Sequence, residues 1–335
     1  MKTKPLRILL TGGAGFIGSH VAEALLSHGA QLTIVDNLDP FYSPERKRLN
    51  LEEISQAGDF EFFQTDICDP HAMREAMLFS RPDVLIHLAA RPGVGPSIQD
   101  PRSYEHTNIS GTLNLLDLCR ELKTPKFIFG SSSSVYGQHS PAPFSEEQTD
   151  LRPISPYAAT KLAGEILCQT YAHLFGLRVT CLRFFTAYGP RQRPDLAIHK
   201  FTALIEAGCA LPMHGNGSSG RDYTHIDDIV SGVLAALDYE PCGVDGIPFE
   251  IFNIGRSHPV RLNELVDLLE HTIGRKAVRN PGPAHPGDPP LTWANISKAS
   301  ARLGYKPVIS LEEGLKQFVE WYRAVQGGLK QAVAS

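Results

Sequence analysis

Short apolar runs alternate with amphipathic stretches along the first half of the chain. The apolar runs have the length of buried strands, and the stretches between them repeat apolar positions with the period of a helix. This alternation predicts right-handed βαβ units, and hence an α/β fold with a doubly wound parallel sheet of the Rossmann type. The expected strands are Arg7–Leu10, Leu32–Val35, Phe60–Gln64, Val84–Leu88, Phe127–Phe129 and Val179–Phe185, and the clearest helices are Gly18–Ser27, Pro101–Leu122 and Pro156–Phe175.

The second half is richer in Gly and Pro and predicts a smaller mixed α/β lobe. Loops are expected at Tyr188–Pro194, Gly215–Gly220 and Asn280–Pro290, and helices at Asp227–Leu237, Leu262–Ile273 and Leu311–Tyr322. We assign residues 1–185 to the Rossmann domain, with 222–247 returning to it, and residues 186–221 and 248–330 to the C-terminal lobe. A cleft between the two would lie over the carboxyl ends of the strands, where α/β folds bind ligands.

Composition narrows the classes of function. The 335 residues carry a net charge of −4 without clustered basic residues, so we expect no nucleic-acid partner. We also expect no membrane span and no secretory leader, because no apolar run is long enough. The six cysteines form no Cys-x-x-Cys pair and the histidines lack metal-ligand spacing, which predicts a cytoplasmic protein with reduced cysteines and no metal site.

A glycine motif joins the first predicted strand to the first helix. Gly12, Gly15 and Gly18 have the spacing G-x-x-G-x-x-G. Such glycines allow a tight turn, close approach of backbone amides to a pyrophosphate, and close packing of helix on strand. Three glycines alone are a weak signal, because glycines also serve ordinary turns. Their position between a strand and a helix favours a dinucleotide site.

An acidic residue ends the second predicted strand. Asp36 can accept both hydroxyls of an adenosine ribose and would repel a 2′-phosphate, which predicts NAD rather than NADP as cofactor. A helix cap or turn is the alternative role for this aspartate. The basic run Arg46–Arg48 could bind a 2′-phosphate, but such a run more often forms a solvated helix face, and we interpret it so.

Later strand ends continue this series of positions. Asp66 and Ile67 follow the third strand, where they would contact the adenine. Leu88, Ala89 and Ala90 follow the fourth, where small residues would let the nicotinamide half lie close to the sheet. The alternative is that these residues only pack at strand ends.

A tyrosine and a lysine are the centre of the predicted chemistry. Ser155 can cap and Pro156 can open a helix on which Tyr157 and Lys161 share one face. A neighbouring ammonium and a positive nicotinamide ring both favour the phenolate, so this pair can remove a proton from a sugar hydroxyl while hydride leaves the same carbon. A buried tyrosine with an unrelated surface lysine is the alternative. Among the serines that end the fifth strand, we predict that Ser132 hydrogen-bonds the reacting oxygen.

These motifs resemble those of the extended short-chain dehydrogenase/reductase family, in particular its nucleotide-sugar epimerases. The resemblance covers roughly Arg7 to Tyr322 and rests on segments beyond the glycine motif: Ser131–Gly137, Tyr157–Lys161, Arg183–Thr186, Arg221–Asp228 and Pro286–Asp288. It implies that Ser132, Tyr157 and Lys161 are catalytic. It further implies a UDP-sugar substrate and a homodimer built on the helices Pro101–Leu122 and Pro156–Phe175. It also implies which further residues bind the cofactor and the substrate. These are Phe16, Ile17, Asn37 and Phe184 for NAD, and Ser134, Thr186, Arg193, Arg221 and Asp288 for the substrate.

Within the family, the segments Asp36–Leu38 and Tyr188–Asp195 are most similar to those of UDP-glucuronate 4-epimerases. Arg193 would then face the substrate carboxylate. Two positions depart from that pattern: Gly95 occupies the place of a loop arginine, and Arg191 that of a tryptophan. Arg91 or Arg191 could compensate, or the substrate is a neutral hexose.

The expected activity is therefore 4-epimerisation of UDP-glucuronate through a 4-keto intermediate, with a UDP-glucose/UDP-galactose 4-epimerase as the alternative. A 4,6-dehydratase is less favoured, because Ser133 and Ser134 stand where dehydratases carry an Asp-Glu pair. A non-catalytic NAD-binding protein is disfavoured, because both Tyr157 and Lys161 are present.

Overall fold

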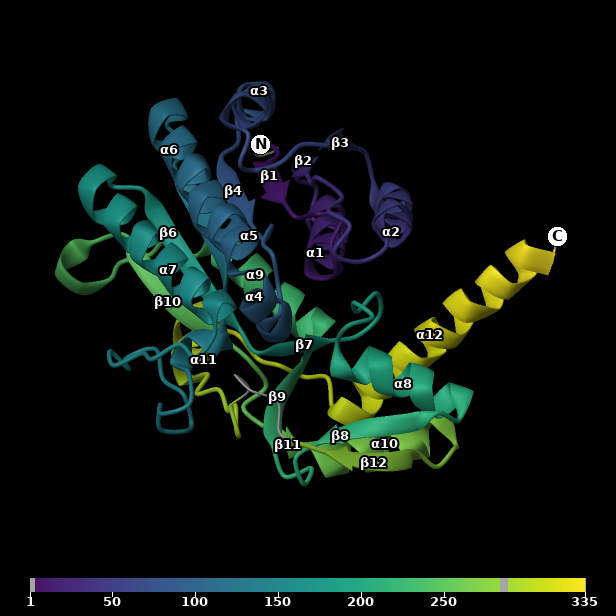
Figure 1. The fold of residues 1–335 in the computed structure, drawn as a ribbon. Coiled ribbons are helices and arrows are strands. Elements are labelled where there is room, and N and C mark those ends of the chain that lie inside the picture. The colour runs from purple at the N-terminus through teal and green to yellow at the C-terminus, as the bar shows by residue number, and fades with distance from the viewer. Residues whose placement is uncertain (1–3, 284–288, 335) are drawn as a thin grey trace.

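A seven-stranded parallel sheet forms the centre of the molecule (Figure 1). The computed structural model describes residues 4–283 and 289–334. The strands lie in the order β10-β6-β5-β4-β1-β2-β3, so the chain winds outward in both directions from β1. Their bounds are β1 Arg7–Thr11, β2 Gln31–Val35, β3 Phe60–Phe63, β4 Val84–His87, β5 Lys126–Ser132, β6 Arg178–Phe184 and β10 Phe249–Ile254. The doubly wound parallel sheet expected from the sequence is confirmed.

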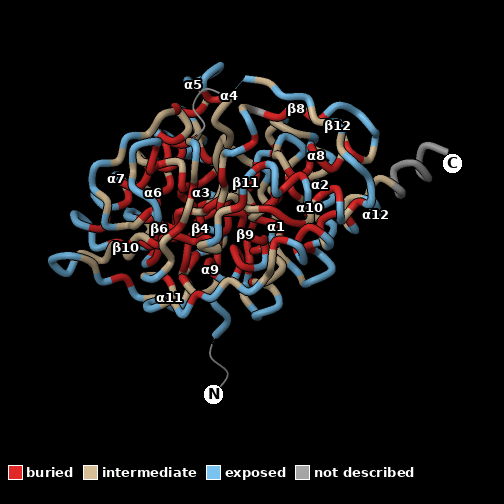
Figure 2. The backbone as a smooth tube through the Cα atoms, turned by 90° about the horizontal axis from the view of Figure 1, so that it is seen from below, coloured by how far each residue is buried: buried red, intermediate tan, exposed pale blue. Residues whose placement is uncertain are grey.

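Alternate residues of the buried strands supply two separate cores, one on each face of the sheet. Ile8 and Leu10 of β1 pack toward helices α1 (Phe16–Ser27), α2 (Pro44–Ala57), α9 (Ile226–Asp238) and α11 (Ser297–Leu303). Leu9 packs on the opposite face toward α3 (Pro70–Ser80), α6 (Thr112–Leu122) and α7 (Pro156–Phe175). Both faces of the parallel sheet are therefore covered, and its central strands β1, β4 and β5 are almost entirely buried, whereas the edge strand β3 is only partly so (Figure 2).

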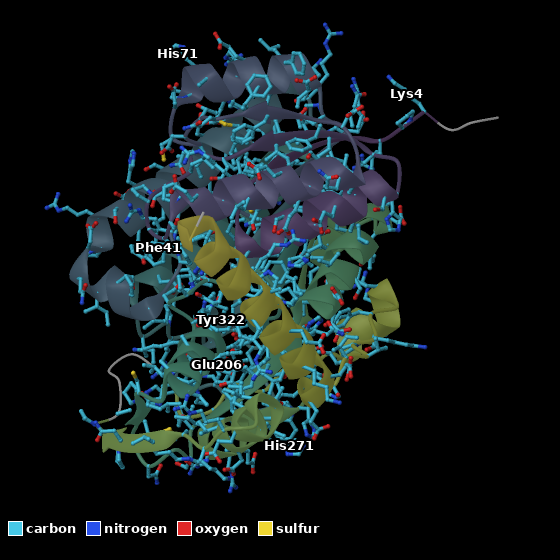
Figure 3. The ribbon with its side chains drawn as sticks, turned by 90° about the vertical axis from the view of Figure 1, so that its right-hand side faces the viewer. Lys4, Phe41, His71, Glu206, His271 and Tyr322 are labelled. Atoms are coloured by element: carbon cyan, nitrogen blue, oxygen red, sulfur yellow. The ribbon has the colours of Figure 1, made fainter. Side chains whose placement is uncertain are left out.

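The C-terminal lobe has two small sheets of its own. One joins β7 (Thr186–Tyr188), β9 (Gly220–His225) and β11 (Pro259–Arg261), and the other pairs β8 (Ala210–His214) with β12 (Val278–Gly282). Helices α8 (Ala197–Ala207), α10 (Leu262–Ile273) and α12 (Leu311–Ala334) share a third apolar core with them. On α12, Tyr322 stands next to Arg323, whose Nε donates to Glu206 of α8 at 2.7 Å (Figure 3). The expected smaller mixed lobe is present.

Three details differ from the sequence-based expectations. Strand β10 lies within 248–330, the range assigned to the lobe, yet it pairs with β6 and extends the large sheet. Residues 280–282, expected in a loop, belong to β12. The helix expected at Pro101–Leu122 is α5 (Pro101–Glu105), a π-helical segment η1 (His106–Gly111) and α6 in direct succession. The remaining short elements are α4 (Val94–Gln99), η2 (Ser133–Tyr136) and η3 (Val244–Gly246).

Within residues 4–283 and 289–334, no helix combines the length and apolar character needed to cross a bilayer. Among the same residues, no group of three or more His, Cys, Asp or Glu side chains is placed to hold a metal ion.

Candidate active site

A cleft opens over the carboxyl ends of the central strands. Its lining runs from the glycine loop past the ends of β2, β4 and β5 to Arg193, so the cleft can hold an extended ligand. All residues predicted to bind the cofactor line it: Gly12, Gly15, Phe16, Ile17, Gly18, Asp36, Asn37, Asp66, Ile67, Leu88, Ala89, Ala90, Tyr157, Lys161 and Phe184. Arg193 lines the same cleft.

The glycine loop leaves no room for side chains at its turn. Gly12 has a φ of 74°, and a Cβ there would lie 2.6 Å from the backbone nitrogen of Ala89. A Cβ on Gly18 would overlap the carbonyl oxygen of Gly12. The loop therefore holds the start of α1 tight against β1 and β4, with the helix N-terminus facing the cleft, an arrangement suited to a pyrophosphate.

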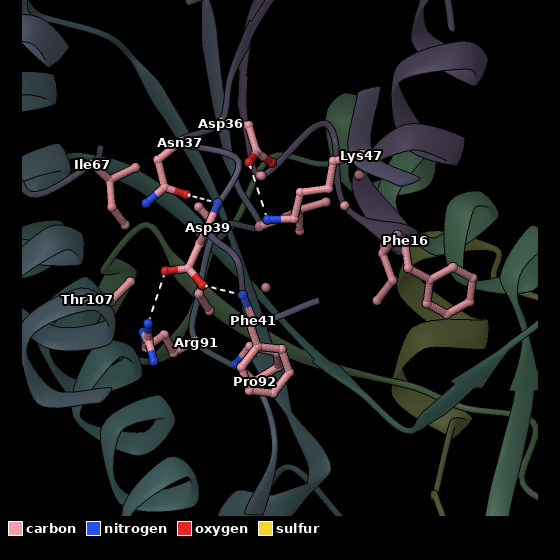
Figure 4. A pocket seen from close by; sticks show the side chains of 18 of the residues that line it. Phe16, Asp36, Asn37, Asp39, Phe41, Lys47, Ile67, Arg91, Pro92 and Thr107 are labelled. Atoms are coloured by element: carbon pink, nitrogen blue, oxygen red, sulfur yellow. Dashed lines mark hydrogen bonds and ion pairs between the residues drawn. The ribbon is translucent and has the colours of Figure 1, made fainter. Parts of the chain in front are cut away.

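Asp36 is buried beneath the cleft and has more partners than the sequence suggested. Its carboxylate accepts from the backbone N–H groups of Ala14 and Leu38, at 3.2 and 2.9 Å. Lys47 of α2 reaches it at 3.7 Å and lies over the Tyr42 ring (Figure 4). The interpretation of Lys47 as part of a solvated helix face is wrong: it is 7% exposed and lines the cleft. Helix α2 turns this one residue of the basic run inward because Lys47 shares its buried face with Asn50 and Ile54.

A polar network that sequence reasoning missed closes one side of the cleft. Arg91 donates to Asp39 at 3.0 Å and to Ser103 at 3.3 Å, and Asp39 also accepts from the backbone of Phe41 (Figure 4). Asn37 donates to Asp66 at 2.9 Å, so two predicted cofactor residues contact each other. Asp39, Phe41 and Arg91 carried no motif of their own, and only the fold brings these loops together.

Helix α7 presents the tyrosine and the lysine to the cleft. Ser155 caps it, accepting from the backbone of Ala158 at 3.2 Å, so the helix begins where the sequence predicted. Lys161 is buried, donates to the carbonyl oxygen of Gly130 at 2.7 Å, and lies 5.0 Å from the centre of the Phe129 ring. Burial lowers the pKa of Lys161 to about 8. The amino group is held beside the end of β5 and gives up its proton more readily than an exposed lysine does.

Opposing influences act on the phenol of Tyr157. Burial raises its pKa, while a hydrogen bond from Ser132 and the positive charge of Arg193 lower it. Ser132 ends β5, and its hydroxyl lies 3.1 Å from that of Ser134. The structure thus brings the three predicted catalytic residues to one place, with two groups that favour the phenolate.

The carboxyl end of β5 is held by buried charges. Ser131 donates to Glu165 at 2.6 Å, and Glu165 accepts both Nε and Nη2 of Arg183 at 2.9 and 2.7 Å. The Arg183 guanidinium also lies over the Tyr136 ring. These contacts tie β5, β6 and α7 together directly beneath Ser132 and Tyr157.

Arg193 reaches the cleft from the loop that follows β7. Two parallel hydrogen bonds of 2.9 Å join its Nε and Nη2 to Asp195, and its guanidinium lies 5.7 Å from the centre of the Phe41 ring. Its Nη1 has no hydrogen-bond partner within the described residues. The other departure from the epimerase pattern, Arg191, does not line the cleft but pairs with Glu23 and Glu53. Of the two arginines considered as compensation for Gly95, only Arg91 lines the cleft.

The remaining predicted substrate residues are less closely grouped. Thr186 opens β7, and Arg221 stands opposite Val260 in the pairing of β9 with β11. Neither they nor the two serines Ser132 and Ser134 border the cleft volume itself. Asp288 lies outside the described residues. The site as a whole can hold a dinucleotide along the strand ends and move a proton at Tyr157.

Comparison with known proteins fits this geometry. A family model described as GDP-mannose 4,6 dehydratase matches residues 9–318. A UDP-glucuronate 4-epimerase of Thermodesulfobacterium geofontis is 42% identical over 314 residues, which cover 93% of this chain and 95% of that protein. The chain belongs to the NAD-dependent epimerase/dehydratase family of extended short-chain dehydrogenases/reductases.

Two solved structures span nearly the whole fold. UDP-glucuronic acid 4-epimerase from Bacillus cereus, in complex with UDP-glucuronic acid and NAD, superposes with a TM-score of 0.88 at 38% identity, covering 95% of this chain and 99% of that one. UDP-glucose 4-epimerase from Thermotoga maritima, with UDP-glucose, superposes with a TM-score of 0.86 at 34% identity and the same coverage.

Proposed function

We propose that this protein is an NAD-dependent UDP-sugar 4-epimerase whose substrate is UDP-glucuronate and whose product is UDP-galacturonate. The observation that carries the proposal is the meeting of Tyr157, Lys161 and the cationic Arg193 in one cleft with the glycine loop and Asp36. The similarity to UDP-glucuronate 4-epimerases over nearly the full length supports the sugar assignment.

The cleft suits NAD at both ends. The glycine loop excludes a Cβ at Gly12 and Gly18, as a pyrophosphate subsite requires, and buried Asp36 is placed to accept ribose hydroxyls. At the other end, Ala89 and Ala90 leave space beside Tyr157 and Lys161 for a nicotinamide ring. NAD, when bound, supplies the acceptor that takes the hydride from C4 of the sugar and returns it to the opposite face.

The proton steps belong to the protein. Tyr157, as phenolate, accepts the proton of the C4 hydroxyl, and Ser132 hydrogen-bonds the oxygen that becomes the ketone. Lys161 keeps a positive charge nearby and stabilises the phenolate. The 4-keto sugar then turns about its phosphate linkage while the nucleotide stays anchored, and Tyr157 gives the proton back. Because proton and hydride both return, the cycle has no net redox change.

Arg193 is the residue that selects the uronate. It enters the cleft that Tyr157 also lines, with Nη1 available for a ligand. Asp195 holds the other edge of the guanidinium, so the side chain keeps one orientation. A C6 carboxylate would meet that free edge, whereas a neutral hydroxymethyl group would gain little from it.

Two alternatives are distinguished by named residues. A UDP-glucose 4-epimerase is the second candidate, because Gly95 stands where uronate epimerases carry an arginine. Dehydration is disfavoured although the family model is described by that reaction, because Ser133 and Ser134 supply no acid to protonate a leaving hydroxyl. In this scheme NAD is bound by residues 1–185, 222–247 and the strand β10. The nucleotide sugar is bound by residues 186–221 with the remainder of 248–330, through Thr186, Arg221 and Asp288.

Incubation of the purified protein with UDP-glucuronate, UDP-glucose and their C4 epimers, without added NAD, tests the proposal. Chromatography should show UDP-galacturonate forming from UDP-glucuronate. Arg193→Leu should lower kcat/KM for the uronate by well over tenfold, as expected when a carboxylate loses a charge-assisted partner, and should affect UDP-glucose far less. Equal losses on both sugars, or a wild type that prefers UDP-glucose, would leave the plain hexose epimerase. A 4-keto-6-deoxy product would show a dehydratase.

A further inference from the structure

The loop of residues 189–196 carries two arginines with different partners. Arg193 lines the cofactor cleft, whereas Arg191 lies between α1 and α2 outside that cleft. Both also border a smaller pocket that is lined by residues of α2 and α12. The position of Arg193 therefore depends on how the neighbouring part of its own loop is fixed.

Arg191 forms ion pairs with carboxylates from two helices at once. Its Nη2 donates to both oxygens of Glu23 on α1, each at 2.8 Å, and its Nε lies 2.8 Å from Oε2 of Glu53 on α2. The Arg191 side chain is 11% exposed and that of Glu23 26%, so this pair is better shielded from solvent than an ordinary surface ion pair, whereas Glu53 is half exposed. One guanidinium thus joins three segments of the chain, which a lysine ammonium could not do with the same fixed geometry.

The backbone of the loop is consistent with a segment under constraint. Arg191 has a φ of 63°, in the left-handed region that side chains rarely adopt. His20 of α1 donates to the carbonyl oxygen of Pro190 at 3.0 Å, and His199 of α8 donates to that of Gln192 at 2.7 Å. Contacts on both sides of Arg191 therefore hold its unusual conformation.

Both helices that Arg191 joins border the cofactor cleft. Phe16 and Ile17 at the start of α1 line the cleft, and α2 carries Lys47, the partner of Asp36. We propose that Arg191 is a positioning residue: through Glu23 and Glu53 it fastens the loop 189–196 to α1 and α2, and so fixes where Arg193 meets the substrate. The effect on substrate choice rests on the proposed function, but the fastening of the loop does not.

Two variants remove this link from either side. Arg191→Ala leaves Glu23 and Glu53 without their common cation, and Glu23→Gln keeps the shape of that side chain but removes its charge. Arg46→Ala is the matched control, because Arg46 borders the same smaller pocket and forms no ion pair within the described residues. Thermal unfolding of each variant, with NAD bound, confirms that the fold is retained.

Hydrogen–deuterium exchange of the NAD-bound enzyme without substrate is the first measurement. The amides of Gln192 and Leu196 close turns within the loop, onto Gly189 and Arg193. Exchange of peptides covering 189–196 should be faster in Arg191→Ala and Glu23→Gln than in wild type and Arg46→Ala. Unchanged exchange in both variants overturns the proposal. This readout needs no sugar, so it stands even if the wild type proves inactive on UDP-glucuronate.

Kinetics provide the second measurement. Arg191→Ala and Glu23→Gln should each raise KM for UDP-glucuronate by about tenfold, the scale expected for a misplaced contact, with UDP-glucose affected less than about threefold. The double variant should be no worse than Arg191→Ala alone, because that change already removes the contact with Glu23. Additive losses, or equal losses on the two sugars, contradict a role in positioning Arg193. If the wild type is inactive on UDP-glucuronate but exchange is faster in the variants, only the proposed substrate is refuted. The fastening of the loop by Arg191 then stands.

Discussion

At the scale of single residues, the chemistry of the cleft depends on the ionisation of Tyr157. Burial opposes the phenolate, and Ser132 and Arg193 are the described residues that lower the pKa of the phenol directly. Lys161 instead donates to Gly130, so its charge acts from the end of β5. The position of the serine is thus as important for the base as that of the lysine.

Ser132→Ala should therefore change the pH dependence of catalysis. Without the hydroxyl, the pKa of Tyr157 rises, the phenolate fraction at a given pH falls, and the ascending limb of kcat/KM against pH moves to higher pH. Tyr157→Phe should lower turnover by at least ~100-fold, the usual contribution of a general base, while NAD stays bound. The measurement is a pH profile of both variants beside the wild type. A limb that stays in place in Ser132→Ala would contradict the assigned hydrogen bond.

Cofactor choice is a second residue-scale question, and here the buried Lys47 alters the expectation. In Asp36→Ala, the Lys47 ammonium loses its carboxylate and faces the cleft alone. NAD affinity should fall by about tenfold or more, because hydrogen bonds to a charged acceptor are lost, whereas NADP should gain relative to NAD. Titration of cofactor-stripped protein with both dinucleotides gives the two Kd values. In the double variant Asp36→Ala/Lys47→Ala, the affinity for NADP relative to NAD should return to a lower value. If NADP still gains in the double variant, Lys47 is not the cause.

At the scale of elements, strands and helices with a clear hydrophobic period could be predicted from the sequence. Strands that are recognised only by their pairing with a distant segment were missed. Strands β1 to β6 and helix α7 follow from alternation and a clear N-cap. Strand β10 was missed because its partner β6 lies more than sixty residues earlier in the chain. Asn280 was placed in a loop because of its Pro- and Gly-rich surroundings, although it pairs with Pro212 of β8.

The π-helical segment η1 shows a similar limit. Asn108 lies inside it, 2% exposed, and its side chain accepts from the backbone N–H of Arg91 at 2.8 Å and donates to the carbonyl oxygen of Arg91 at 3.0 Å. It also donates to Thr160 of α7 at 3.0 Å. One side chain therefore ties the loop after β4, which lines the cleft, to the helix that carries Tyr157. No local pattern indicated this role.

Asn108→Ala should destabilise the protein and loosen the cofactor site together. Two backbone groups of Arg91 would lose their partners, and each unsatisfied buried group costs roughly 1–3 kcal/mol. We expect the free energy of unfolding to fall by about 2 kcal/mol or more, and NAD to bind more weakly because the Ala89–Arg91 loop is released. Urea unfolding and an NAD titration measure the two effects. Weaker stability with unchanged NAD affinity would show that Asn108 supports only the fold.

At the scale of the whole molecule, the exposed face of helix α7 carries no Asp, Glu, Lys or Arg side chain. The charged residues of α7 are Lys161 and Glu165, and both are buried. Its exposed positions include Ile166, Leu174 and Phe175, at 57, 61 and 46% exposure. Helix α6 lies beside α7 (Figure 1), and its Leu113 is also exposed. A surface helix without exposed charge is typical of a protein interface. This face coincides with the pair of helices on which the expected homodimer would form.

Ile166→Glu should therefore dissociate the protein into monomers. A carboxylate at the centre of an apolar interface would lose its water without gaining a partner, a cost of several kcal/mol that would be incurred twice in a symmetric dimer. The wild type should sediment at twice the chain mass at micromolar concentration, and the variant at the chain mass. Val244→Glu is the matched control, since Val244 is 82% exposed in η3 and its replacement should leave the assembly intact. Sedimentation velocity of all three proteins decides the matter: a monomeric wild type, or an Ile166→Glu variant that still sediments as a dimer, would show that α7 is not the interface. Because α7 also carries Tyr157 and Lys161, loss of turnover in the monomeric variant would show that dimer formation stabilises the catalytic helix.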